Sequence, residues 1–144
     1  MKEYRPCELD SFEEFDRKLG ECYTDKSAIE RLIPCTLEGC VVRISDIIAY
    51  LGKDRQDAQR ADVTRESSFE SGAIGSRNAE IINNLTVNIV ENSYGKDYIK
   101  MDSEHFLALK TAKSDNYKMI YRQPALCDTL DNIVRPMMRD IYQR

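Results

Sequence analysis

The sequence contains a single histidine, His105, and its five cysteines include no C-x-x-C pair. Cys35 and Cys40 are separated by four residues, and no histidine lies near enough to complete a zinc pattern. His105 falls in a segment with helical spacing, where a lone histidine is more often a surface or hydrogen-bonded residue than a ligand. A transition-metal centre needs several nitrogen, sulfur or oxygen ligands. We therefore expect this chain alone to bind no metal.

Long apolar runs are also missing. No stretch approaches the roughly 20 apolar residues that a membrane span requires, and the N-terminal MKEYRPCELD is polar, so we expect no secretory signal there. The formal net charge of −4 and the pI of about 5.1 give no electrostatic attraction to nucleic acid or to an anionic membrane. An odd number of thiols without a pairing pattern is typical of a reducing compartment, so we predict a cytoplasmic protein.

Alternation of apolar and polar residues, which is the pattern of half-buried strands, is almost absent. The G-x-G-x-x-G, Walker A and G-x-S-x-G motifs are missing too, so neither a phosphate-binding loop nor a nucleophile elbow is predicted. Apolar residues recur instead at helical spacing. A chain of 144 residues can build one core but not two full domains. We predict one all-α domain, a helical bundle, over residues 1–144.

Capping residues and prolines predict where the helices begin and end. Ser11 and Glu14 stand in the capping-box relation, and Thr36 and Asp102 or Ser103 are expected N-caps. The stretch 64–76, TRESSFESGAIGS, predicts a loop that either lines a site or is a plain surface connection. Residues 1–10 are expected to be irregular. Helices are expected at 11–23, within 24–34, at 36–54 and directly after it, at 77–92, from 103 until Pro124 and at 126–142. A stop or bend is expected near Gly52 or just after Asp54, an extended link at 97–101 and a kink at Pro136.

The clearest helix signal runs from Thr36 to Asp57, TLEGCVVRISDIIAYLGKDRQD. One face is apolar, because Leu37, Val41, Ile44, Ile48 and Leu51 recur at helical spacing and Cys40 and Ile47 widen the stripe. Further apolar residues are expected to be buried in the neighbouring helices. These are Ile29, Leu32 and Ile33 before this helix, and Phe106, Leu107, Leu109, Met119, Ile120 and Tyr121 after it.

The opposite face of the same helix carries reactive side chains. At about 100° per residue, Asp46, Tyr50 and Asp54 fall within about 80° of one another, with Arg43 and Lys53 alongside. A carboxylate and a tyrosine one turn later can supply a metal-binding oxygen and a phosphate-binding hydroxyl. The alternative interpretation of this face is an ordinary solvent-exposed surface of mixed charge.

The residues Asp46-Ile-Ile-Ala-Tyr50, followed by Asp54, resemble the D-x-I-A-Y-x-x-x-D signature of HD-domain deoxynucleoside triphosphate triphosphohydrolases, the bacterial dGTPase-like family. The similarity continues through Asp57-Ala58 and Arg60-Ala61. It extends more loosely over AEIINNLTVNIVENS, YIKMDSEHFLALK and NYKMIYRQP, so that it covers residues 32–124. This resemblance implies an HD-domain-like architecture. It also implies that Asp46 is the last metal ligand of an H…HD…D set, and that Tyr50 and Asp54 contact the sugar and phosphate part of a nucleotide.

The earlier histidine and the His-Asp pair of that family are absent, since no histidine precedes residue 36. We therefore expect the chain to be the C-terminal part of a metal-dependent phosphohydrolase that converts a deoxynucleoside triphosphate and water to deoxynucleoside and triphosphate, inactive as an isolated chain. A divalent metal ion is expected in the complete enzyme. Basic side chains would offset the developing phosphate charge. The candidates are Arg43, Lys53, Arg55, Arg60 and Arg77, each of which is alternatively a solubilising surface charge.

Two other interpretations remain open at the level of sequence. The chain is alternatively a regulatory or assembly module that kept the HD scaffold without its chemistry, or a helical bundle in which the Asp-Tyr-Asp stripe is a coincidence. A piece of a larger domain exposes apolar surface where other helices would pack. We therefore predict self-association into a homo-oligomer.

Overall fold

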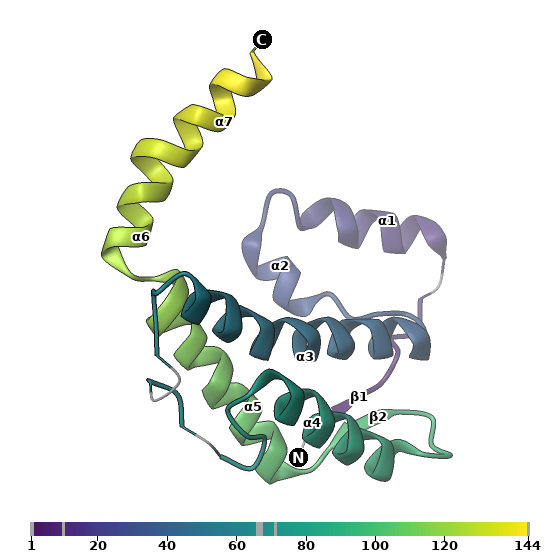
Figure 1. Ribbon diagram of the computed structural model, residues 1–144. Helices are drawn as coiled ribbons and strands as arrows, with labels where there is room; N and C mark the ends of the chain where they lie inside the picture. Colours follow the sequence, from purple (N-terminus) through teal and green to yellow (C-terminus); the bar gives the residue numbers. More distant parts are fainter. Residues whose placement is uncertain (1, 10, 66–67, 71, 144) are drawn as a thin grey trace.

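The computed structural model describes residues 2–9, 11–65, 68–70 and 72–143. Helices make up most of this part of the chain, so the predicted all-α class is confirmed (Figure 1). In chain order the elements are β1 (Lys2–Tyr4), α1 (Phe12–Glu21), α2 (Lys26–Arg31), α3 (Leu37–Arg60), α4 (Asn78–Ser93), β2 (Ile99–Met101), α5 (Ser103–Asn116), the π-helical turn η2 (Tyr117–Tyr121), α6 (Pro124–Thr129), the π-helical turn η3 (Leu130–Val134) and α7 (Arg135–Tyr142). None of the helices among the described residues is both long and apolar enough to cross a lipid bilayer.

Three helices begin at capping residues that the sequence predicts. The side chains of Ser11, Thr36 and Asp102 each accept the backbone N–H three residues later, over 3.3, 3.0 and 2.8 Å. Each bond satisfies an N–H of the first turn that has no partner within its own helix. The starts of α1, α3 and α5 are therefore set by local sequence.

Helix α3 does not stop or bend near Gly52, and the predicted break there is wrong. It continues to Arg60, and two residues later Asp62 is left-handed, with φ of 56°. Gly52 serves a different purpose, because a Cβ at this position would lie 2.6 Å from the backbone Cα of Asn78. The glycine allows α4 to begin close against α3.

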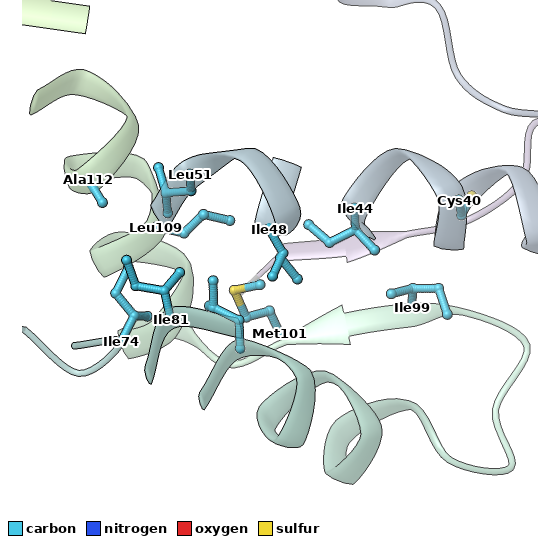
Figure 2. Packing of buried hydrophobic residues seen from close by; sticks show 11 residues of the cluster. Cys40, Ile44, Ile48, Leu51, Ile74, Ile81, Ile99, Met101, Leu109 and Ala112 are labelled. Atoms are coloured by element: carbon cyan, nitrogen blue, oxygen red, sulfur yellow. The ribbon is translucent and has the colours of Figure 1, made fainter. Parts of the chain in front are cut away.

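The core lies where α3, α4, α5 and β2 meet. Figure 2 shows the apolar face of α3 pointing toward side chains of the other three elements and of the loop before α4. Burying each large aliphatic side chain stabilises the fold by about 1.5–3 kcal/mol. The cluster consists of Cys40, Ile44, Ile48, Leu51, Ile74, Ile81, Leu85, Ile99, Met101, Leu109 and Ala112.

The N-terminal segment, expected to be irregular, forms strand β1. It pairs antiparallel with β2, with Lys2 opposite Met101 and Tyr4 opposite Ile99. The extended link predicted at 97–101 thus contains a strand. Three residues are too few to show a periodic pattern in the sequence, so the partner strand was not recognisable.

Helices α1 and α2 lie on the side of α3 opposite α4 (Figure 1). The predicted burial of Ile29 and Ile33 is wrong, because these side chains are 54% and 48% exposed. The buried residue of α2 is Ala28, a small side chain that lets the helix approach its neighbours. The apolar faces of α1 and α2 are therefore only partly covered.

The stretch 64–76 contains no α-helix among its described residues, while residues 66, 67 and 71 lie outside the description. Its two large apolar side chains, Phe69 and Ile74, are both buried. They attach the loop to two different apolar clusters, which also contain Ile120 and Ile81 respectively.

Beyond the core, Pro124 starts α6 instead of only ending the preceding helix. In place of the kink expected at Pro136, the structure has the π-helical turn η3. This turn ends at Val134, and α7 begins at the next residue, Arg135. Pro136 has no N–H for the Asn132 carbonyl, and the N–H of Arg135 bonds to the carbonyl of Leu130, five residues earlier. The π-helical turn therefore accommodates the proline within one helical arm.

Candidate functional site

The structure places Asp46, Tyr50 and Asp54 along one wall of a cavity of about 330 Å³ between α3 and α5. These three residues follow one another at four-residue intervals, so α3 presents them in a row. Asp46 and Tyr50 are exposed, with Tyr50 60% accessible, and Asp54 is half-buried. Ile47 and Leu51 form the apolar floor beside them.

The opposite wall of the cavity comes from α5 and η2, which were not predicted to contribute to a site. Lys113, Tyr117 and Tyr121 line the cavity together with Asn116. Their spacing of four residues matches that of the three α3 residues and is the signal that could have identified them. Tyr121 was expected to be buried, but its side chain is 49% exposed. It faces the cavity and not the core.

A hydrogen bond connects the two walls: the hydroxyl of Tyr121 donates to the carboxylate of Asp54. Burial and this neighbouring carboxylate raise the pKa of Tyr121 to about 12, so the phenol stays protonated at neutral pH. The rings of Tyr121 and Tyr117 lie 5.5 Å apart between centroids with an interplanar angle of 55°. This tilted pair gives the cavity an aromatic wall.

Behind the cavity, a buried polar contact holds α3 against α5. Asn116 donates to the carbonyl of Leu51 at 2.9 Å and accepts from Nε of Arg55 at 2.8 Å. Arg55 is only 2% exposed and its guanidinium lies 4.3 Å from the centroid of the Phe69 ring. Burial lowers the pKa of Arg55. Arg55 was a candidate for offsetting phosphate charge, but its guanidinium is enclosed by the core and it does not line this cavity.

Two other predicted site residues lie outside the cavity walls. Arg43 donates to the carbonyl of Leu32 at 2.5 Å, which ties the segment after α2 to α3. Lys53 pairs with Asp57 at 2.5 Å on the outer surface of α3. The structure thus brings together Asp46, Tyr50 and Asp54 but not the two basic residues, whose role as substrate contacts remains a prediction.

His105 is also remote from the cavity lining and takes part in a helix cap. Its Nδ1 lies 3.0 Å from both carboxylate oxygens of Asp102, and Asn88 donates to the same carboxylate at 2.5 Å. The hydrogen bond from the His105 backbone N–H is the largest of the causes that lower the pKa of Asp102 to about 2. This network joins α4 to the start of α5.

Two curated relatives share the name deoxyguanosinetriphosphate triphosphohydrolase-like protein. The relative from Caldanaerobacter subterraneus subsp. tengcongensis is 32% identical over 91 residues, which is 61% of this chain. The relative from Desulfatibacillum aliphaticivorans is 33% identical over 101 residues, 65% of this chain. The resemblance to the dGTPase-like family is confirmed.

The matched segments amount to 27% and 28% of these two relatives, so the chain spans little more than a quarter of their length. No family model matches the sequence, and no solved structure matches it. The cavity residues therefore belong to a chain that resembles only a part of those dGTPase-like proteins.

The described residues do not by themselves fit a divalent metal ion. No group of three or more histidine, cysteine, aspartate or glutamate side chains in this part of the chain is arranged to hold one. In the cavity between α3 and α5, Asp46 and Asp54 offer carboxylates, but Asp54 already accepts a hydrogen bond from Tyr121.

Proposed function

We propose that this chain forms the nucleotide-binding part of a metal-dependent HD-domain phosphohydrolase, which converts a deoxynucleoside triphosphate and water to deoxynucleoside and triphosphate. The observation that supports the proposal is the cavity in which α3 presents Asp46, Tyr50 and Asp54 opposite Lys113 and Tyr121. A solvated surface of mixed charge would not need this concavity or the bond between its walls.

The cavity suits the parts of a nucleotide. The aromatic rings of Tyr50, Tyr117 and Tyr121 offer flat apolar surface to a sugar or base. Lys113 offers a cation on the same wall as Tyr117, and an ammonium group is a common partner of phosphate. Asp54, held by the Tyr121 hydroxyl, keeps acceptor capacity for a sugar hydroxyl. We assign substrate contact to these residues.

Catalysis requires more than this chain supplies. In the proposed enzyme Asp46 would offer one carboxylate to a divalent metal ion, and a histidine and a His-Asp pair from residues outside these 144 would supply the other ligands. A metal held there would supply a Lewis acid for phosphate oxygens and water. The isolated chain is proposed to bind the nucleotide without hydrolysing it.

Nucleotide binding to this chain is the direct test. We expect dGTP, titrated by calorimetry or by NMR, to bind and to perturb the signals of Tyr50 and Lys113. Tyr50→Ala should weaken binding at least tenfold, since it removes one aromatic wall. Tyr94→Ala is the matched control, because Tyr94 is 87% exposed and does not line the cavity. Unchanged binding in Tyr50→Ala would contradict the assignment.

A second test restores the missing ligands. An extended chain that carries an upstream histidine and a His-Asp pair should bind a divalent metal and release triphosphate from dGTP. Asp46→Ala in that chain should lose both metal and activity. Full metal content and full rate in this variant would remove Asp46 from the site.

A non-catalytic regulatory or assembly module on the same scaffold is the second candidate. It differs from the first in one measurable respect. Under this interpretation the extended chain binds neither metal nor dGTP, although the helical fold is retained.

A further inference from the structure

A second cavity, of about 360 Å³, lies where the start of α4 meets α3. It shares no lining residue with the cavity between α3 and α5. Arg55, which is buried, belongs to its inner part, and Arg77, which is exposed, belongs to its mouth. The described residues that line it include these two arginines and no acidic side chain. This lining therefore favours an anion as the ligand.

The guanidinium of Arg55 has one nitrogen without a partner. Nε donates to Asn116 at 2.8 Å and Nη2 donates to the carbonyl of Ala112 at 3.4 Å, both on α5. Nη1 is buried and has no hydrogen-bond partner among the described residues. Since Nε and Nη2 share one edge of the planar group, Nη1 lies on the opposite edge and points away from α5.

This orientation directs Nη1 to the cavity at the start of α4. The described lining of that cavity comes from α3, the start of α4 and the residues just before it, and none of it from α5. Arg55 also borders a cavity that α5 lines, which is the side that Nε and Nη2 face. The carboxylate of Asp115, which acts on the charge of Arg55, belongs to α5 as well.

The start of α4 supplies further hydrogen-bonding groups. Oδ1 of Asn78 is buried and has no partner within the described part of the chain. Asn78 and Ala79 are the first residues of α4, and the N–H groups of a first turn have no acceptor in their own helix and attract anions. Glu80 accepts the backbone N–H groups of Ser76 and Arg77, at 3.2 Å each, so these two are already engaged.

We propose that this cavity binds a phosphate group, either as inorganic phosphate or as part of a small phosphate ester such as a sugar phosphate. The phosphate oxygens accept from Nη1 of Arg55 and from the first turn of α4. A P–OH or sugar hydroxyl donates to Oδ1 of Asn78, which a carboxylate or sulfate ion cannot do. No aromatic ring belongs to the described lining, so a small polar ester suits the cavity better than a nucleotide, whose base needs a stacking surface.

Titration of this chain with inorganic phosphate, ribose 5-phosphate and sulfate, followed by NMR, tests the site. The titration is made at about pH 6, where roughly half of a phosphate monoester carries the P–OH donor. We expect both phosphates to shift the amide signals of Asn78 and Ala79, and sulfate to bind at least threefold more weakly. Tighter binding of ribose 5-phosphate would assign an ester as the ligand, and equal binding would assign the phosphate group alone. Absence of binding of both phosphates at tens of millimolar, or equal binding of sulfate, would overturn the proposal.

A charge placed in the lining tests the location. Gln59→Glu adds a carboxylate to the cavity and should weaken phosphate binding at least tenfold, because it repels the anion. Gln143→Glu is the matched control, since it adds the same charge at an exposed position outside the cavity, and should bind like the wild type. Arg55→Gln should also lose binding while it retains its helical circular dichroism; if that variant unfolds, Gln59→Glu alone decides. Undiminished binding in Gln59→Glu would contradict this site.

Discussion

At the scale of single residues, Asp102 connects three features: the start of α5, the side chain of Asn88 on α4 and the ring of His105. Its folded-state pKa of about 2 lies below the ordinary 3.8. A lowered acidic pKa stabilises the fold above about pH 4 and loses this contribution as the pH falls toward 2. The carboxylate is 38% exposed, so after solvent screening we expect about 1 kcal/mol from it.

Asp102→Asn should therefore flatten the decline in unfolding free energy between about pH 4 and pH 2, measured by urea denaturation at several pH values. Asp140→Asn, on the exposed surface of α7, is the control and should follow the wild-type profile. A decline of the same size in Asp102→Asn would show that other groups govern acid unfolding.

A second prediction at this scale concerns the titration of Tyr121. Its pKa of about 12 lies above the ordinary 10, so folding favours the protonated phenol, and this stabilisation is lost as the pH rises from 10 to 12. Tyr121→Phe should remove the latest step from the absorbance titration of the tyrosines and cost about 1 kcal/mol of stability at neutral pH. Tyr94→Phe removes an exposed phenol and should leave that late step in place.

At the scale of elements, the close contact between α3 and α4 depends on Gly52. A methyl group there would overlap the backbone of Asn78, which cannot swing aside as a side chain can. Gly52→Ala should therefore lower the unfolding free energy by about 1–3 kcal/mol, in spite of the higher helix propensity of alanine. Gly20→Ala in α1 meets nothing within 4 Å and should retain or increase stability. Equal effects of the two substitutions in denaturant unfolding would contradict this account of α3.

At the scale of the whole molecule, the body around α3 and the C-terminal helices α6 and α7 differ in what stabilises them. The body has its own core, whereas every described residue of 124–142 is exposed or half-buried. Because a segment with little apolar burial opens locally at low free energy, the amide hydrogens of α6 and α7 should exchange with solvent faster than those of α3, measured by hydrogen–deuterium exchange. Equal protection of α7 and α3 would contradict this difference. A homo-oligomer and a cytoplasmic location both remain predictions from sequence.

The sequence by itself determined the helices and their starts, because capping and periodicity act between residues that are close in the chain. Ser11, Thr36 and Asp102 cap the helices that they were expected to cap. The Asp46-Tyr50-Asp54 row was also visible, since one regular helix carries it. The same local rules misread Gly52, whose role depends on a helix that begins 26 residues later.

Only the tertiary structure decided what faces this row. Lys113, Tyr117 and Tyr121 reach the cavity because α5 packs across α3 through the buried contact of Arg55 with Asn116. The bonded residues on the two walls, Asp54 and Tyr121, are 67 residues apart in the chain, and periodicity carries no information over that separation. In the same way, Tyr121 has the spacing of a core residue but faces the cavity. The side of its helix that is buried depends on how the neighbouring helices pack.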